Sequence, residues 1–483
     1  MMLTLILLPA IVGAVLPLLK NKKSQHCTVA AALILEAVLA AIALFAPEQE
    51  MVLFAMTDSL TVALKMDGIS KLFMAIAAFG FMLTGIYAFR YLEHEEKDSR
   101  FFTFFLLSQA ALMGMDFSRN LITMYLFFEM VTLLSVPLVL FDRTEEAVRG
   151  ALKYLFYSVA GAFLALGCIF FLSQYCVSLE FIPGGNLDME KVAGHEKLLL
   201  VLVFLGVLGF GAKAGMYPLQ GWLPTAHPVA PAPASAVLSG IIAKAGVLAI
   251  IRVIYFSVGA EFLRNTWVQQ AWIGLALLTV FMGSMMAYRE KVFKKRLAYS
   301  SVSQISYALV GLFFLTPESG LGGLLHVLFH AVIKVCLFLV AGSFIHNTGK
   351  YHVDEFVGFG KSMPKTLWGF TLAALALIGI PPASGFVSKW YLALGALDSG
   401  MAVYSWLTPV VLLISALLTA GYLLPITVSG FFPGKDAVLP EKNDEGGWAM
   451  AAPICILSGL TLIMGLFAGE LVPLMEKLAA SLF

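Results

Sequence analysis

Charged residues are scarce in this sequence: only 13% of its 483 residues are Asp, Glu, Lys or Arg, whereas 60% are apolar. This composition lies outside the range of soluble globular domains and predicts a polytopic membrane protein in a lipid bilayer. The formal net charge of +1 gives no electrostatic basis for binding nucleic acid or a strongly charged soluble partner.

Cysteine is also rare, and its placement excludes several kinds of redox and metal chemistry. The five cysteines are scattered in or beside apolar segments without a CxxC pair. This pattern favours neither a disulfide framework nor an iron–sulfur or zinc site. The sequence has no nucleotide-binding loop, nucleophile triad or metal-ligand set, so we expect no cofactor in this chain and no catalysis by it alone. The sequence leaves open whether the chain is the ion-pumping subunit of a redox-driven translocase.

Long apolar runs are what the sequence has in abundance. Windows of about 20 apolar residues, the length that crosses the hydrocarbon core of a bilayer, predict fourteen helices. The first lacks a basic region and a cleavage site, so we expect it to be a retained span. The predicted spans are 2–19, 27–46, 68–90, 101–116, 120–141, 150–173, 197–217, 231–257, 270–288, 294–315, 320–345, 365–397, 404–431 and 448–470.

The basic residues are distributed unevenly between the two sides of the membrane in this predicted topology. Nineteen fall in loops on one side and eight in loops on the other. Because cytoplasmic loops carry the excess of Lys and Arg, both termini are predicted to lie on the extracytoplasmic side. The remaining basic residues lie inside spans, and all of them are lysines, which can release a proton as arginine cannot. They are Lys213, Lys244, Lys334 and Lys389.

Two of the predicted helices are interrupted. The seventh contains "GMYPLQGWLP" around Pro218, and the twelfth contains "GIPPASGF" around Pro381. Irregular backbone at membrane depth is tolerated only inside protein or against water, so each break predicts a hydrated interior. The two prolines lie 163 residues apart, the spacing of two inverted five-helix repeats with matching broken helices. Two unrelated proline kinks would give the same spacing.

This repeat divides the chain into four predicted parts. Helices one to three precede the repeats, helices four to eight form the first repeat, helices nine to thirteen form the inverted second repeat, and helix fourteen ends the chain. The predicted fold class is therefore an all-α polytopic membrane protein with discontinuous helices seven and twelve. The predicted limits are 1–100, 101–257, 258–431 and 432–483.

A carboxylate and a lysine form the first candidate functional pair. Glu129 lies near the middle of the fifth predicted span, where a charge costs several kcal/mol unless it is paired or hydrated. Lys213 stands beside the break in helix seven of the same repeat and is the candidate partner. A single structural ion pair would explain these two residues equally well.

Further titratable residues inside the spans favour a proton relay over one structural pair. Lys244 lies in mid-span, and Lys389 follows the second break. His326, His330 and Lys334 are spaced by four residues and therefore share one face of the eleventh helix. Histidine suits the middle of a relay because it exchanges protons near neutral pH.

Other titratable residues have weaker interpretations. His227, just after the first break, is either a relay member or a loop residue. His326 and His330 have the spacing of a zinc pair, but no third ligand is evident, so we expect no metal. Glu36 lies outside both repeats and is interpreted as a local pair or lateral contact. Asp116 is expected at the membrane interface.

Six motifs between residues 120 and 392 together resemble the antiporter-like membrane subunits that Mrp-type sodium/proton antiporters, respiratory complex I and energy-converting membrane hydrogenases share. The lysine at position 389 is similar to that of the D-type Mrp subunit and of certain complex I subunits, whereas "HVLFHAVIK" is similar to the distal pump subunit of complex I, so the parent complex stays open. The motifs are "YLFFEM", "GAKAGMYPLQGWLPTAHP", "GIIAKAGVLAIIR", "RLAYSSVSQISY", "HVLFHAVIKVCLFLVAG" and "GIPPASGFVSKW".

The resemblance implies a subunit that moves protons, or exchanges them for sodium, beside other membrane subunits in a prokaryotic cell membrane. It implies Glu129 and Lys213 as the input pair, Lys244 as the central relay and Lys389 as the output site. The three residues on the linking helix would be His326, His330 and Lys334. A non-conducting structural subunit is the alternative, and a polytopic membrane enzyme is a third hypothesis.

Overall fold

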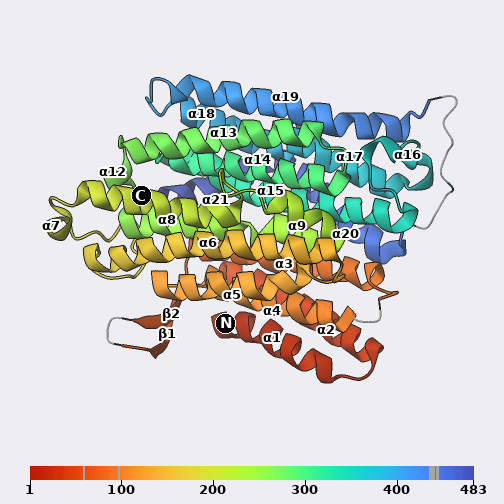
Figure 1. The fold of residues 1–483 in the computed structure, drawn as a ribbon, viewed down its shortest axis with the longest axis horizontal. Helices are drawn as coiled ribbons and strands as arrows, with labels where there is room; N and C mark the ends of the chain where they lie inside the picture. Colours follow the sequence, from red (N-terminus) through yellow and green to blue (C-terminus); the bar gives the residue numbers. More distant parts are fainter. Residues whose placement is uncertain (58–59, 96–97, 435–440, 442–444) are drawn as a thin grey trace.

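The computed structural model describes residues 1–57, 60–95, 98–434, 441 and 445–483, and it is a bundle of helices. Figure 1 shows the helices side by side, with α1 and α2 along one edge and α19 along the other. Within the described residues, ten helices are long and apolar enough to cross a membrane, and two shorter apolar helices accompany them. The predicted all-α polytopic membrane fold is confirmed.

The elements of the N-terminal half are α1 (Met2–Val15), η1 (Leu16–Leu18), α2 (Lys22–Phe45), β1 (Gln49–Ala55), β2 (Thr61–Met66), α3 (Gly68–Tyr91), α4 (Asp98–Asp116), α5 (Leu121–Val139), α6 (Glu145–Tyr175), α7 (Met189–Val192), α8 (Glu196–Ala214), α9 (Leu223–Val229), α10 (Ala232–Val237), η2 (Leu238–Ile242), α11 (Lys244–Ile251) and η3 (Arg252–Val258). The segments η2 and η3 are π-helical, so the span from α10 to η3 is one continuous but unevenly wound helix.

The elements of the C-terminal half are α12 (Ala260–Leu263), α13 (Trp267–Arg289), α14 (Phe293–Phe313), α15 (Pro317–Thr348), η4 (Val353–Glu355), α16 (Phe359–Ser362), α17 (Pro364–Ile378), α18 (Ser384–Leu397), α19 (Tyr404–Phe431), α20 (Gly447–Leu466) and α21 (Ala468–Ala480). A helix stands at each of the fourteen predicted spans. Helix α14 is rich in serine, yet it lies among the other helices with most of its side chains buried.

The two predicted helix breaks have matching backbone geometry. Gly215 follows the end of α8 and Gly379 follows the end of α17, both in the left-handed conformation that glycine adopts without strain. A cis peptide bond before proline follows in each break, at Pro218 and at Pro382. The pair α8/α9 runs in the opposite direction to the pair α17/α18 (Figure 1). The repeats are therefore inverted relative to each other.

A β-hairpin between α2 and α3 was not predicted. Its strands β1 and β2 pair antiparallel, and the chain after α4 extends the pairing, since Lys65 N donates to Phe117 O (2.6 Å) and Arg119 N donates to Ala63 O (3.0 Å). Both chain termini lie at the same end of the bundle as the hairpin (Figure 1). We call this the hairpin end.

Two sequence expectations stay predictions. The membrane side that the hairpin end faces follows only from the count of basic residues, and three of those counted, Lys97, Lys435 and Lys442, lie outside the described residues. The four domain limits likewise stay a prediction. The C-terminal part holds two helices, α20 and α21, where the sequence predicted one.

Candidate functional site

Lys213 is completely buried, and neutral hydroxyl groups surround its amine. It lies on the last turn of α8, and its Nζ donates to Thr132 Oγ1 of α5 (2.7 Å) and to Tyr154 OH of α6 (2.7 Å). The amine also lies 4.8 Å from the centre of the Tyr154 ring. These contacts solvate a buried ammonium without neutralising its charge.

Glu129 and Lys213, the predicted pair, do not form a direct ion pair in this structure. Glu129 is half-buried on α5, and its Oε1 has no hydrogen-bond partner among the described residues. Thr132 lies one turn further along the same helix face and takes the place beside the amine. The structure thus brings the carboxylate and the lysine to the same region but leaves a hydroxyl, rather than an ion pair, in contact with the lysine.

A short series of hydrogen-bonded hydroxyl groups leads from the Lys213 amine to the backbone of α5. Tyr154 OH lies 2.8 Å from Ser135 Oγ, which in turn donates to Val131 O at 2.6 Å. Sequence reasoning missed Thr132, Tyr154 and Ser135. Thr132 could have been found from its position one turn after Glu129, but Tyr154 comes from another helix and has no local sequence pattern that marks it.

Lys244 is buried at the junction between η2 and α11. Its Nζ donates to the backbone carbonyl of Ser239 (2.6 Å), and no acidic residue pairs with it in the part of the chain that the structure describes. The Ser239 hydroxyl lies 2.6 Å from Ser301 Oγ of α14. The π-helical winding of η2 is a feature often found at functional sites.

The serines of α14 also contact the next buried lysine. Lys334 of α15 is fully buried, and its Nζ donates to Leu297 O (2.9 Å) and to Ser300 Oγ. Ser301 Oγ donates to the same Leu297 carbonyl at 2.9 Å. The contacts of Ser239, Ser301 and the Leu297 carbonyl therefore bring Lys244 and Lys334 to neighbouring parts of α14.

Removing the Ser301 hydroxyl tests this connection. We expect Ser301→Ala to lower ion transport several-fold in the assembled complex, because the change breaks the hydroxyl contact between η2 and α14. Ser306→Ala is the matched control, since the Ser306 hydroxyl lies on the same helix, is buried and has no hydrogen-bond partner among the described residues. Equal transport by both variants, measured as pH change in proteoliposomes, would contradict the connection.

The predicted histidine face is present on α15. The rings of His326 and His330 stack with centroids 5.9 Å apart, and Tyr307 of α14 stacks on His326 at 5.3 Å. His326 Nδ1 lies 2.9 Å from Ser388 Oγ of α18. The two histidines therefore lie between Lys334, further along their own helix, and the second broken helix.

Two lysines donate hydrogen bonds to backbone carbonyls at the C-terminal ends of helices beside the breaks, α17 and α9. Lys389 Nζ donates to Leu377 O (2.6 Å) and Ile378 O (2.9 Å), the last residues of α17. Lys294, the second residue of α14, is buried and donates to the carbonyl of Ala230, after α9. Cations are stabilised at helix C-termini by the backbone dipoles, and breaks in membrane helices place such ends inside the protein.

His227 lies in the short helix α9 and is fully buried. Its two ring nitrogens have no hydrogen-bond partner among the described residues. The ring stacks on Phe338 of α15 (4.9 Å between centroids) and lies 6.2 Å from Trp222, which in turn stacks on Tyr154 at 4.5 Å. His227 thus stands between the Lys213 site and α15, so it is not an exposed loop residue.

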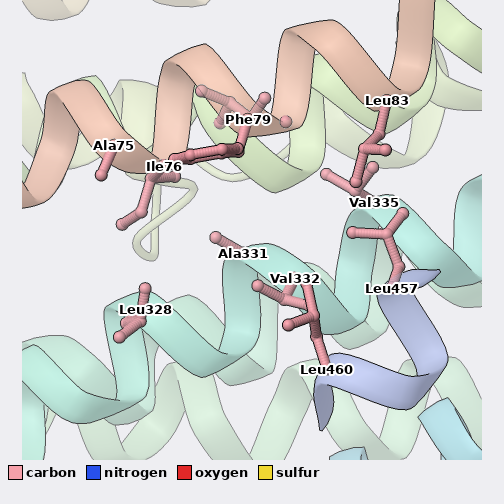
Figure 2. Close-up of a pocket in the computed structure, with 12 residues that line it drawn as sticks. Ala75, Ile76, Phe79, Leu83, Leu328, Ala331, Val332, Val335, Leu457 and Leu460 are labelled. Atoms are coloured by element: carbon pink, nitrogen blue, oxygen red, sulfur yellow. The ribbon is translucent and has the colours of Figure 1, made fainter. Parts of the chain in front are cut away.

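An apolar crevice lies on the opposite face of α15 from the histidines. Its volume is about 160 Å³, and Figure 2 shows Ile76 and Phe79 of α3 facing Leu328 and Val332 of α15, with α20 beside them. Every residue that lines it is apolar or glycine. His326, His330 and Lys334 therefore lie on the side of α15 that faces α14 and α18, away from this crevice.

The fold and the site together define a class of protein: a polytopic membrane protein built from inverted repeats, with two broken helices and a set of buried lysines between them. The family model described as NADH:quinone oxidoreductase/Mrp antiporter, TM, matches residues 118–419. That match covers more than half of the chain, so the protein belongs to this family, and the resemblance inferred from the motifs is confirmed.

The relatives of the chain include subunits of an NADH-quinone oxidoreductase and of a Na⁺/H⁺ antiporter. The chain is 33% identical over 432 residues to NADH-quinone oxidoreductase subunit N of Desulforudis audaxviator, covering 85% of this chain and 83% of the relative. It is 29% identical over 428 residues to the D-type subunit of a Na⁺/H⁺ antiporter of Bacillus subtilis, covering 87% and 83%. A chain in respiratory complex I from Thermus thermophilus has the same fold, with a TM-score of 0.83, 25% identity and full coverage of both chains.

Proposed function

We propose that the chain is a proton-translocating subunit that works beside other membrane subunits in a complex of the Mrp antiporter or complex I type. The observation that carries this proposal is the buried pair Lys244 and Lys334, which have no acidic partner in the described structure and lie beside the Ser239–Ser301 contact and the Leu297 carbonyl. Desolvated amines without counter-charges are costly, and a structural ion pair cannot explain them.

The proposed route uses the site residues in a fixed order. Protons enter where Glu129 and Lys213 lie close to the first break, and the charge of the carboxylate sets how strongly the amine holds its proton. They continue by water to Lys244, and from there through the serines and histidines to Lys389. His227 stands beside the first step of this route. The unpaired backbone groups at the two helix breaks can bind water and stabilise charged groups at membrane depth.

Transport through this route needs a source of free energy outside the chain. Moving one charge against 100 mV costs about 2.3 kcal/mol, so a partner's redox reaction or a counter-ion gradient must drive the proton. We propose a prokaryotic cell membrane as the location, with the hairpin end on the extracytoplasmic side, as the uneven distribution of basic residues favours.

Glu129→Gln tests this function directly. The amide has nearly the same shape but no charge, so Lys213 would lose the group that controls its proton, and we expect transport to fall about tenfold. Proton movement is measured with a pH-sensitive dye in proteoliposomes that contain the purified complex. The control is Glu261→Gln, whose side chain is 83% exposed beside Arg264. Wild-type transport by the Glu129 variant would favour a non-conducting structural subunit.

A further inference from the structure

A second buried charged cluster lies towards the hairpin end, outside the proposed route. Arg252, the first residue of η3, is 2% exposed. Its Nη1 donates to Asp67 Oδ2 (2.6 Å), and its Nη2 donates to Asp67 Oδ1 (2.9 Å). Asp67 also caps α3, because its Oδ1 accepts from Ser70 N at 2.8 Å. This bidentate pair holds the guanidinium in one orientation.

Asp116, the last residue of α4, completes the cluster. It was expected at the membrane interface, and its depth in the membrane stays a prediction; within the protein Asp116 is 1% exposed, and its two carboxyl oxygens have no hydrogen-bond partner among the described residues. Its helix α4 packs against α11, which leads into η3 and Arg252, but both Nη atoms of Arg252 are already used by Asp67. A buried carboxyl group without a donor is stable only when it carries a proton.

The cluster is continuous with the proposed route. Arg252 follows Lys244 by eight residues in the single helix from α10 to η3, which corresponds to about 12 Å of rise. Towards the hairpin end, the backbone around the cluster is tied together, since Lys65 N donates to Phe117 O (2.6 Å) and Ile182 N donates to Phe256 O (3.1 Å). The cluster therefore lies between Lys244 and the hairpin.

We propose that Asp116 is a proton-binding site that connects the route at Lys244 with the solution at the hairpin end. In this step Lys244 passes a proton through water to the Asp116 carboxylate and becomes a neutral amine. Asp116 then releases the proton towards the hairpin, and the nearby positive charge of Arg252, although paired with Asp67, lowers the cost of the carboxylate that remains. Arg252 is a positioning residue in this step, and Asp67 orients it. The inference rests on the proposed function, because it needs a proton at Lys244.

The test compares two buried carboxyl groups in the assembled complex. Asp116→Asn should lower proton transport about tenfold, and Asp116→Glu should restore part of it. Glu36→Gln is the matched control, because Glu36 is also 1% exposed and its two carboxyl oxygens also lack a partner among the described residues, but it lies on α2, outside this cluster. Transport by Asp116→Asn equal to that by Glu36→Gln would overturn the proposal.

Infrared spectroscopy gives a second readout that does not need transport. A protonated Asp116 should give a carboxyl C=O band that is lost in Asp116→Asn and shifted in Asp116→Glu, so a failure of the asparagine variant to assemble leaves the glutamate variant as the test. A spectrum that neither variant changes would overturn the proposal. Normal transport by Asp116→Asn together with loss in Glu129→Gln would reject this site while the proposed function stands.

Discussion

Replacing Lys213 by alanine should reduce proton transport by the assembled complex to about a hundredth of the wild-type rate or less. The amine is the group that meets Thr132 and Tyr154 beside the first break, and alanine leaves no side chain there that binds a proton. The loss should exceed that of Ser301→Ala, which only weakens a connection between two remaining amines. The measurement is the initial rate of pH change in proteoliposomes.

Lys197→Ala is the matched control for this prediction. Lys197 lies near the start of the same helix α8, but its side chain is exposed. Both variants remove one lysine from α8, so a general effect on helix insertion would appear in both. Equal transport by the two variants, with equal amounts of assembled complex, would contradict the role of Lys213.

Gly385→Ala should destabilise the second broken helix and reduce the amount of assembled complex. A Cβ at this position would lie 1.8 Å from the backbone oxygen of Ala376, so the first turn of α18 would have to move away from the last turn of α17. Overpacking of this kind costs about 1–3 kcal/mol. Ser388 and Lys389 lie one turn further along α18, so their contacts with His326 and with the end of α17 would be lost together.

Gly167→Ala controls for the change from glycine to alanine in a membrane helix. Gly167 lies on α6, and no atom lies within 4 Å of the Cβ that alanine would add. We expect this variant to keep the wild-type melting temperature, or to raise it slightly, because alanine favours the helix. A Gly385 variant that melts at the same temperature as the Gly167 variant would show that α17 and α18 separate at little cost.

Hydrophobicity and proline placement were enough to predict most of the fold. The apolar runs located each long helix because a span needs a nearly continuous apolar segment, and Pro218 and Pro381 located the two breaks. The strands β1 and β2 were missed because they are short, and a hydropathy window of about 20 residues carries little information about such short strands. The π-helical segments were missed because no residue type in η2 or η3 marks the extra residue per turn.

The candidate site was predictable for the titratable groups but not for their partners. Lys213, Lys244 and Lys334 stand out because a charged residue in mid-span is rare. Their hydrogen bonds go to hydroxyls and carbonyls of other helices, such as Tyr154 and Leu297, and those partners depend on tertiary packing. The same limit explains why a direct contact between Glu129 and Lys213 was expected where Thr132 is found.

Proton transport by the Lys213→Arg variant tests the central claim most directly. Arginine keeps the positive charge at this position but cannot release a proton under physiological conditions, so the variant separates a structural charge from a relay. If Lys213 passes protons, the assembled complex should transport at less than about a tenth of the wild-type rate. Wild-type transport by this variant would contradict the account, because a fixed charge would then be sufficient.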